Sequence, residues 1–559
     1  MTAQANFGPV DNQKSKESLL RTVPYTAVQF TNGFWGNYQE LNRTVSLRHG
    51  FDMLEQAGNL KNLRLAAGLD TGRFAGYWFA DSDVYKWLEA VAWELGRAPD
   101  VELAKMGDQA IALVEQAQEE NGYLNSYYQT VKPTEKWTDL DHGHELYCAG
   151  HLMQAAVAYK RALDDDRLLN VTLKFLDHID EELVKSGREE TCGHPEIETA
   201  LVELYRVTGT ARHLELAQIF IDRRGHNKMR GHAGYGAVYQ QDHIPVREAA
   251  EMAGHAVRQL YLTTGVTDLY MESGEEALIE AMDRLWDDMT QRKLYVTGGV
   301  GPRFDGEAFG SPYELPSDTA YCETCAAIAS LMWNWRLLLL TGERKYADLF
   351  ERTLFNGLLS SPGLEGKSYL YVNPLHVRNG RYVRASADTG TGEARLRPTW
   401  HNCACCPPNV MRLFSSLHHY LATVTEAGVQ IHQYAAAHLN LTVQDAPVQI
   451  AMATAYPQNG QINLTMTQSA ASPWSLSLRI PAWCKNYELS LNGEKIAAQQ
   501  FEGGYVTVER VWEAGDILSL NLPMAPEFIA PHPRIDALRG CVSLQRGPLV
   551  YCFESHDQP

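Results

Sequence analysis

Between about residue 40 and residue 422, apolar residues recur at the spacing of three and four that amphipathic helices show. The segment SDVYKWLEAVAWELG (82–96) carries such an apolar stripe from Val84 to Leu95. After a short polar break, VELAKMGDQAIALVEQAQ (101–118) repeats the period. The two segments predict a helical hairpin.

The same unit of helix, break and helix recurs along the chain, and at least five hairpins fit between residues 80 and 360. Three helices are predicted to close at a glycine, which adopts the left-handed C-cap conformation at little cost. These glycines end LYRVTG (204–209), YLTTG (261–265) and LLLTG (338–342). The count favours an (α/α)6 barrel over residues 25–422, with loops around a pocket at one end, and an open solenoid is the alternative.

After about residue 423 the period of the apolar positions changes to two, as in half-buried strands. Asn492-Gly493 predicts a hairpin turn. We therefore expect a multidomain α and β protein, in which a C-terminal β-sandwich (423–525) follows the barrel. Residues 526–559 are expected to start a further, truncated β domain, and residues 1–24 to pack on the β domains. The segments with a period of two are VQIHQY (429–434), SLSLRI (475–480), YELSLNG (487–493) and ILSLNL (517–522).

The charge balance narrows the classes of partner. The formal net charge is -19 over 559 residues, which disfavours binding to nucleic acid and to anionic membranes. The first twenty residues lack the apolar core of a signal peptide, and no stretch reaches 18 uninterrupted apolar residues. We expect a cytoplasmic protein. Because thiols stay reduced there, its ten cysteines are expected to be metal ligands, catalytic groups or buried side chains.

The most unusual stretch is HNCACCPPN (401–409), which holds three of the ten cysteines. A second segment, YCETCAA (321–327), adds Glu323 and Cys325 at the start of a predicted helix. Together with Cys405 and Cys406, these residues offer three thiolates and one carboxylate, a complete tetrahedral shell for zinc. The spacing differs from the usual C-x-x-C knuckle, and the alternative is a set of inert buried cysteines.

Further candidates are polar residues that the barrel would turn toward its pocket. For each of the three histidines, the alternative is a structural role. For the glutamate, which lies in a glycine-rich loop, the alternative is a solvated surface charge. The chain has no P-loop, no dinucleotide-binding glycine motif and no G-x-S-x-G elbow. The candidates are His144 in GHELYCAGH, His194 in CGHPEIETAL, His255 in EMAGHAVRQL and Glu307 in the loop 296–315.

Taken together, these segments resemble glycoside hydrolase family 127, a family of β-L-arabinofuranosidases. The matching segments follow one another over nearly the whole chain, and the pairing of ETC with CACCPPN is highly specific. They are DSDVYKWLE (81–89), GHELY (143–147), GHPEIE (193–198), GHAVR (254–258), ETCA (323–326), LFNG (354–357), YVNPL (371–375), CACCPPN (403–409) and RGPLVYC (546–552).

The resemblance implies an (α/α)6 catalytic barrel that binds Zn²⁺ through Glu323, Cys325, Cys405 and Cys406. It implies that Cys405 is also the nucleophile and Glu307 the general acid/base. A thiol has a pKa of about 8.5 and is mostly protonated at neutral pH, but coordination to zinc would deprotonate it.

The resemblance also implies residues of the sugar subsite. The chain departs from the family pattern at Cys322, whose role stays open, as does that of Cys403. Relatives usually continue past RGPLVYC with more β structure. The implied subsite residues are His144, His194, His255 and Tyr371, with Glu351 supporting the pocket.

The implied activity is that of a retaining, exo-acting hydrolase that releases L-arabinose from β-L-arabinofuranosides. Its partner would be a small oligosaccharide or glycoside, and a homodimer is among the open oligomeric states. Three alternatives compete: a hydrolase of another sugar, a sugar epimerase, and a non-catalytic carbohydrate-binding protein with a structural zinc. Only the nucleophile hypothesis requires Cys405→Ser to fold normally and lose turnover.

Overall fold

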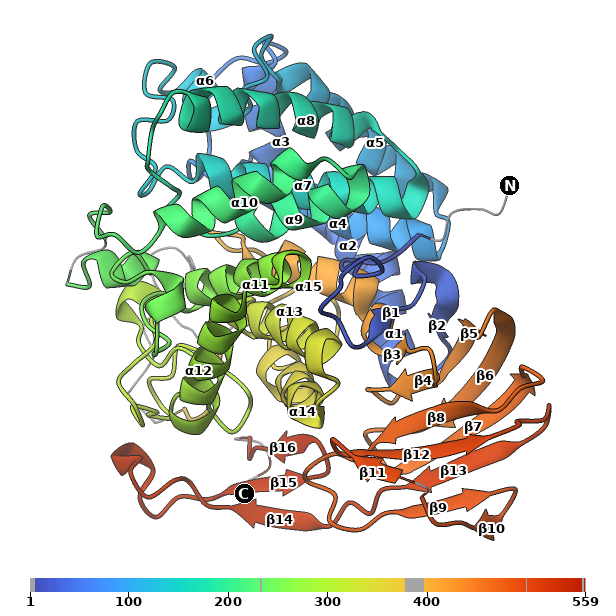
Figure 1. Ribbon diagram of the computed structural model, residues 1–559. Coiled ribbons are helices and arrows are strands. Elements are labelled where there is room, and N and C mark those ends of the chain that lie inside the picture. Colours follow the sequence, from blue (N-terminus) through green and yellow to red (C-terminus); the bar gives the residue numbers. More distant parts are fainter. Residues whose placement is uncertain (1–5, 232–233, 378–396, 499, 555–556, 558–559) are drawn as a thin grey trace.

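A computed structural model of the protein describes residues 6–231, 234–377, 397–498, 500–554 and 557. The chain builds a helical region first and a β region second (Figure 1). No helix within these described residues is both long enough and apolar enough to span a membrane. The α-helices are α1 (Phe34–Leu41), α2 (Leu47–Gln56), α3 (Asn59–Ala66), α4 (Asp81–Arg97), α5 (Val101–Ala117), α6 (Ser126–Thr130), α7 (Glu145–Leu163), α8 (Arg167–Ile179), α9 (Ile197–Thr208), α10 (Ala211–Arg223), α11 (Ala256–Ser273), α12 (Glu276–Arg292), α13 (Thr324–Thr341), α14 (Arg344–Arg352) and α15 (Cys406–Ser416).

The predicted hairpins are present as the pairs α4–α5, α7–α8, α9–α10, α11–α12 and α13–α14. In each pair the first helix is buried on nearly every side, whereas the second is amphipathic. A helix that is apolar all round, such as α13, has to be enclosed by other elements. Among the described elements, α4, α7, α9, α11, α13 and α15 contact one another in this order, and α15 contacts α4 again. Their contacts therefore close into a ring.

The glycine predictions are confirmed at two positions and wrong at the third. Gly209 ends α9 and Gly342 ends α13, both in the left-handed conformation, with φ of 71° and 68°. Gly265 instead lies inside α11, which continues to a left-handed C-cap at Gly274. A Cβ at Gly265 would stand 2.9 Å from the Cβ of Glu198 on α9, so this glycine permits the close approach of two helices.

The segments with a period of two form strands. One sheet has the strand order β1-β3-β4-β8-β12-β11, a second has β10-β9-β13-β7-β6-β5-β2, and residues 526–551 add the sheet β14-β15-β16. Asn492 and Gly493 both have positive φ in the turn between β9 and β10, which confirms the predicted turn. The strands are β1 (Arg21–Thr22), β2 (Val28–Phe30), β3 (Ala422–Val424), β4 (Gly428–Ile431), β5 (Ala437–Val443), β6 (Ala446–Thr454), β7 (Gln461–Gln468), β8 (Trp474–Arg479), β9 (Glu488–Leu491), β10 (Glu494–Lys495), β11 (Gln500–Glu502), β12 (Tyr505–Arg510), β13 (Ile517–Asn521), β14 (Pro526–Ile529), β15 (Ser543–Arg546) and β16 (Leu549–Tyr551).

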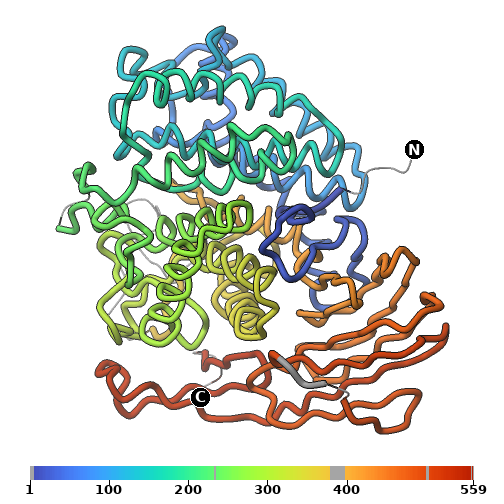
Figure 2. The backbone as a smooth tube through the Cα atoms, in the orientation of Figure 1, coloured from blue at the N-terminus to red at the C-terminus, as the bar shows by residue number. Residues whose placement is uncertain are grey.

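The N-terminal segment joins the β region to the helices. β1 pairs with β3 and β2 pairs with β5, so the start of the chain contributes one strand to each large sheet. The dark-blue segment accordingly lies beside the orange one in Figure 2. β2 falls after residue 25, the predicted start of the helical domain, yet it belongs to a sheet. Its three residues are too short a segment for the apolar period to identify.

A buried ion pair connects α14 to the sheet that contains β8. Arg479 on β8 has no exposed side-chain surface, and its guanidinium lies 2.5 Å from Oε1 of Glu351 and 2.5 Å from Oδ1 of Asp348. Tyr456 and Trp483 donate further hydrogen bonds to Glu351. Because a buried charge without a partner is strongly destabilising, this cluster fixes the helical region against the sheets.

Replacing Glu351 with alanine is expected to destabilise the protein by about 3 kcal/mol, because it leaves the buried Arg479 with Asp348 as its one carboxylate partner among the described residues. The matched control is Glu488→Ala, which removes a partner of Lys495 from an exposed pair on the sheet surface. Calorimetric unfolding should show a clear fall in melting temperature for Glu351→Ala and no measurable change for the control. Equal shifts in the two variants would contradict a stabilising role for the buried pair.

Candidate metal and catalytic site

Several of the predicted site residues occupy the same position in their helices, the N-terminal cap. The unpaired backbone N–H groups of a helix N-terminus carry a partial positive charge that favours carboxylates and thiolates nearby. The ring of helices brings these caps to one end of the helical region, where the sequence patterns placed the pocket. The cap residues are His144 of α7, Glu196 of α9, His255 of α11, Glu323 of α13 and Cys405 of α15.

The four predicted metal ligands lie together. The Sγ atom of Cys325 is 3.6 Å from that of Cys405 and 3.4 Å from that of Cys406, and Cys405 and Cys406 are 3.7 Å apart. Oε1 of Glu323 lies 3.6 Å from the sulfur of Cys405 and 4.0 Å from that of Cys406. The four side chains thus enclose a single small volume.

This donor set fits a zinc ion. Zinc–sulfur bonds of about 2.3 Å place the ligands of a tetrahedral site about 3.8 Å apart, close to the sulfur–sulfur distances in the cluster. One donor atom from each of the four residues lies within 4.8 Å of the others. In addition, Oε2 of Glu323 is buried and accepts no hydrogen bond from any described residue, which is costly for a carboxylate that has no cation beside it.

The three thiols of the cluster differ in their charge state and their access to solvent. Burial raises the pKa of the Cys406 and Cys325 thiols. Hydrogen bonds from the neighbouring thiols, above all that of Cys325, hold the pKa of Cys405 well below its usual range. Cys405 is also half-buried, whereas the other two are buried. Cys405 is therefore the most acidic and most accessible thiol of the cluster, as a nucleophile has to be.

Glu307 is held at the edge of the same site. Its Oε2 lies 3.1 Å from Nε2 of His255, and its Oε1 accepts a hydrogen bond of 2.8 Å from the hydroxyl of Tyr321. One of its carboxylate oxygens is within 4.8 Å of a carboxylate oxygen of Glu323. Its backbone is left-handed, with φ of 49°, and its side chain is only 17% exposed. The alternative of a solvated surface charge does not describe this residue.

The three predicted histidines form one wall. The ring centroid of His194 lies 5.7 Å from that of His144 and 5.9 Å from that of His255. Burial lowers the pKa of His144 to about 3 and also lowers the pKa of His194 and His255. They are neutral at neutral pH. Because Nδ1 of His194 lies 2.8 Å from the carbonyl oxygen of Pro195, its Nε2 is left for another partner. Neutral imidazoles of this kind suit sugar hydroxyls.

Tyr371 is brought to the cluster as well. Its hydroxyl oxygen lies 3.3 Å from the sulfur of Cys405. Its backbone carbonyl accepts a hydrogen bond of 2.9 Å from the amide of Thr324 in the first turn of α13. This contact fixes the segment that carries Tyr371 against the helix that carries Cys325. The hydroxyl therefore has a defined position beside the reactive sulfur.

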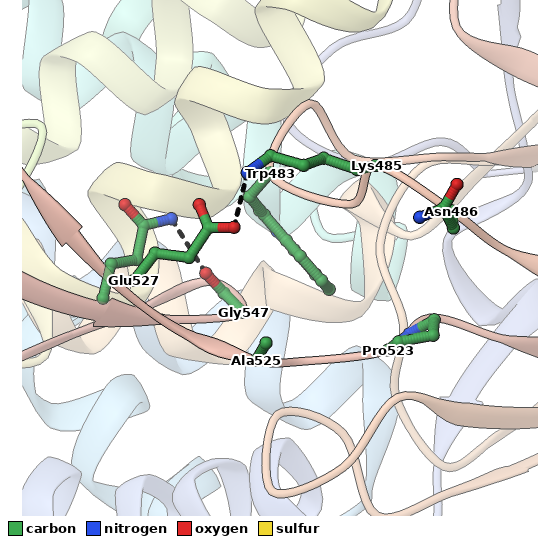
Figure 3. A pocket seen from close by; sticks show the side chains of 8 residues that line it. Trp483, Lys485, Asn486, Pro523, Ala525, Glu527 and Gly547 are labelled. Atoms are coloured by element: carbon green, nitrogen blue, oxygen red, sulfur yellow. Dashed lines mark hydrogen bonds and ion pairs between the residues drawn. The ribbon is translucent and has the colours of Figure 1, made fainter.

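The structure does not bring Glu351 to this site. The residue belongs to the ion pair with Arg479, and its Oε2 accepts from the indole nitrogen of Trp483. Trp483 also lines a cavity of about 250 Å³ between the sandwich and the sheet β14-β15-β16 (Figure 3). The residues that line that cavity lie in the β region, so it is separate from the cluster. Glu351 can support the pocket only indirectly, through the position of α14.

Cys322 and Cys403, whose roles the sequence left open, are placed differently. Cys322 packs in a separate small core with Tyr295, Leu315 and Ile535, away from the thiols. Burial raises its pKa, which keeps it a thiol. Cys403 is buried and donates a hydrogen bond that favours the anionic form of Cys405. Cys322 therefore packs in a core of its own, whereas Cys403 lies beside Cys405.

Sequence reasoning did not single out Lys86 and Tyr147. The ring of Tyr147 lies 4.4 Å from that of His194 and 5.6 Å from that of His144, and its hydroxyl accepts a hydrogen bond of 2.7 Å from Lys86. The sequence shows only a lysine among the apolar residues of a predicted helix. The structure adds that residues 81–94 of this helix are all buried. A charged residue in such a helix is rarely structural alone.

Models of one protein family match this chain in three consecutive segments that begin at residue 27. Residues 27–419 match the model of the β-L-arabinofuranosidase GH127 catalytic domain, 428–524 that of the GH127 middle domain, and 526–559 that of the glycoside hydrolase family 127 C-terminal domain. A non-reducing end β-L-arabinofuranosidase of Bifidobacterium longum subsp. longum is 36% identical over 532 residues, 89% of this chain and 79% of that protein.

Solved structures of the same family are also similar. A GH127 β-L-arabinofuranosidase from Geobacillus stearothermophilus T6 superposes with a TM-score of 0.88 at 40% identity, covering 94% of this chain and 86% of its own. A second GH127 β-arabinofuranosidase gives a TM-score of 0.90 at 34% identity, with coverage of 98% and 87%.

The two cysteines that flank Glu323 provide a matched test of the metal site. Cys325→Ala is expected to lose most of the bound metal, because it removes one of four donors. Cys322→Ala should bind metal as the wild type does, since its thiol lies in another core. The measurement is metal content per protein after purification and dialysis. Retention of metal by Cys325→Ala, or its loss from Cys322→Ala, would contradict this ligand set.

Proposed function

The chain belongs to glycoside hydrolase family 127, and we propose that it is a retaining, exo-acting β-L-arabinofuranosidase. Membership makes it a glycoside hydrolase. One observation carries the finer proposal: Glu323 lies beside both Cys405, the most accessible thiol of the cluster, and the carboxyl group of Glu307. A retaining glycosidase requires this combination of a nucleophile and a proton donor.

We propose that the ring of helices is the inner wall of an (α/α)6 barrel. The closing contact between α15 and α4 supports it, because an open solenoid would leave its first and last helices apart. The more exposed partner helices would form the outer wall. In such a barrel the caps of the inner helices surround one pocket, which is where Glu323 and Cys405 lie.

Glu323, Cys325, Cys405 and Cys406 would hold Zn²⁺ in this pocket. When bound, the ion would keep the Cys405 sulfur deprotonated and fix its position. The support is the donor set itself, with its sulfur–sulfur distances and the unpartnered oxygen of Glu323.

In the first half of the reaction, Sγ of Cys405 attacks C1 of the sugar and forms a C–S bond. The bond between C1 and the glycosidic oxygen breaks, and Glu307 gives its proton to that oxygen. Tyr321 and His255 hold the carboxyl group of Glu307 in place through both of its oxygens. The product of this half-reaction is a thioglycosyl enzyme together with the released leaving group.

In the second half, Glu307 takes a proton from water, whose oxygen attacks C1 on the face that the leaving group has vacated. The C–S bond breaks and its electron pair returns to Cys405. Two displacements at C1 restore the original configuration. His144, His194 and Tyr371 are proposed to bind the hydroxyl groups of the sugar, because their neutral polar groups line the approach to the sulfur.

The substrate is proposed to be a small oligosaccharide or glycoside that carries a terminal β-L-arabinofuranose. The curated relative is named as a non-reducing end β-L-arabinofuranosidase, and its 36% identity supports the choice of sugar. A net charge of -19 argues against nucleic acid and anionic membranes as partners. The homodimer and the cytoplasmic location stay predictions.

Cys405→Ser should fold and lose at least about 10³-fold in kcat on an aryl β-L-arabinofuranoside, because an alcohol oxygen is a far weaker nucleophile than a thiolate. Glu307→Gln should lose about 10²- to 10⁴-fold on substrates with poor leaving groups. With an activated aryl leaving group it should instead accumulate a glycosyl adduct on Cys405, which mass spectrometry of the peptide would detect. Cys541→Ser, at an exposed thiol, is the control. A folded Cys405→Ser enzyme with wild-type turnover would contradict the nucleophile assignment.

The anomer released first is expected to be the β form, because the scheme uses two displacements at C1. Proton NMR of the reaction during its first minutes, before mutarotation, would show it. Initial release of the α anomer would contradict the scheme while leaving the fold intact. Hydrolysis of another sugar only, with retained configuration, would change the substrate and keep the mechanism.

A further inference from the structure

Lys86 is a buried ammonium that the proposed reaction does not use. It lies in the second turn of α4 and is 1% exposed. In the described part of the chain, its hydrogen bond goes to the neutral hydroxyl of Tyr147, over 2.7 Å, and not to a carboxylate. Burying a lysine in this way is unfavourable unless negative charge lies nearby.

Asp83, three residues earlier, is a carboxylic group on the same face of α4. It is buried, and its Oδ2 accepts a long hydrogen bond of 3.4 Å from the side-chain amide of Asn59. Burial raises the pKa of Asp83 to about 7, even though Lys86 lowers it. At neutral pH Asp83 is therefore only partly ionised and balances only part of the lysine charge.

The thiol cluster is a further source of negative charge near Lys86. α4 contacts α15, whose N-cap is Cys405, and the charge of Lys86 interacts with the thiols of Cys405 and Cys325. Tyr147, which holds the ammonium, interacts with the same two thiols. Lys86 on α4 and Tyr147 on α7 are therefore joined by a hydrogen bond between two packed helices, one of which also contacts the helix that Cys405 caps.

A loaded cluster would need such a cation. Three thiolates and one carboxylate carry four negative charges against the two positive charges of zinc, which leaves a net charge of about −2 in a buried site. The histidines beside the cluster cannot balance it, because burial keeps His144, His194 and His255 neutral. A permanent cation on α4 meets this requirement.

We propose that Lys86 is a positioning residue that supplies the counter-charge of the cluster of Glu323, Cys325, Cys405 and Cys406, with Tyr147 holding its ammonium in place. The inference rests on the proposed zinc centre. It makes Lys86 act through the cluster and not on the sugar. If this is correct, removing the positive charge of Lys86 weakens zinc binding, whereas removing a nearby negative charge does not weaken it.

The test compares two substitutions of opposite charge in adjacent turns of α4. Lys86→Met removes a positive charge at similar volume, and Asp83→Asn removes a negative charge. Zinc affinity is measured at fixed pH by competition with a chromophoric chelator, on variants whose folding is verified by circular dichroism. Lys86→Met should bind zinc about 10- to 100-fold more weakly, the usual effect of losing an outer partner of a metal site. Asp83→Asn should bind it as tightly as the wild type or more tightly.

The controls separate charge from packing. Tyr147→Phe keeps the ammonium and removes its anchor, so it should lose less zinc affinity than Lys86→Met. Equal weakening by Lys86→Met and Asp83→Asn would show a structural role and overturn the inference, as would wild-type affinity in Lys86→Met. If Lys86→Met does not fold, Asp83→Asn decides alone: unchanged or tighter binding supports the counter-charge, and weaker binding overturns it.

The outcome is separable from the proposed function. A folded wild type that binds no zinc overturns the metal centre and this inference together. A wild type that binds zinc but cleaves no arabinofuranoside leaves the counter-charge standing, because the measurement involves no sugar.

Discussion

The site depends on the placement of several helix N-termini around one buried volume. Each N-terminal turn directs unpaired N–H groups and a partial positive charge at its cap residue. Glu323 and Cys405 are two such caps, and the first residue of α15 is the third thiol, Cys406. Anionic side chains that would be very unfavourable in an apolar core become acceptable there. The ring of helix contacts keeps these caps together, so the packing of the helices also determines the geometry of the site.

Buried polar contacts away from the site maintain that ring. Arg412 of α15 lies 2.7 Å from Glu89 of α4 and donates to Asn409 and Tyr261. On the other side of the helical region, Arg479 connects the sheets to α14. The sheets therefore contribute to the site by fixing the outer helices, although they supply no donor to the cluster. Glu351, which was expected to support the pocket, therefore acts only by holding α14 against the sheets.

The sequence allowed the helical hairpins, the strands and the grouping of Glu323 with three cysteines to be predicted, because each leaves a local signal: an apolar period, or cysteines crowded beside a helix start. It misled at Gly265, where a glycine that permits close helix packing looks the same as a C-cap. It could not place Cys322, one residue from a donor, because its left-handed backbone turns the side chain into another core. Lys86 and Tyr147 meet only in three dimensions, and no period in either segment records their contact.

Part of the backbone strain of the protein lies in segments that carry residues of the proposed site. His144, Glu307 and Cys322 all have positive φ, a conformation that costs a residue other than glycine about 1–3 kcal/mol. Two of these residues carry groups assigned to the reaction, and the third directly precedes Glu323. Such conformations persist only where surrounding contacts determine them. Here the bonds of Glu307 to His255 and Tyr321 and the packing of Cys322 against Ile535 do so. Because Ile535 lies between β14 and β15, the last part of the chain helps to hold the segment that carries the proposed acid/base and the metal ligand, and the precision of the site extends to the far end of the fold.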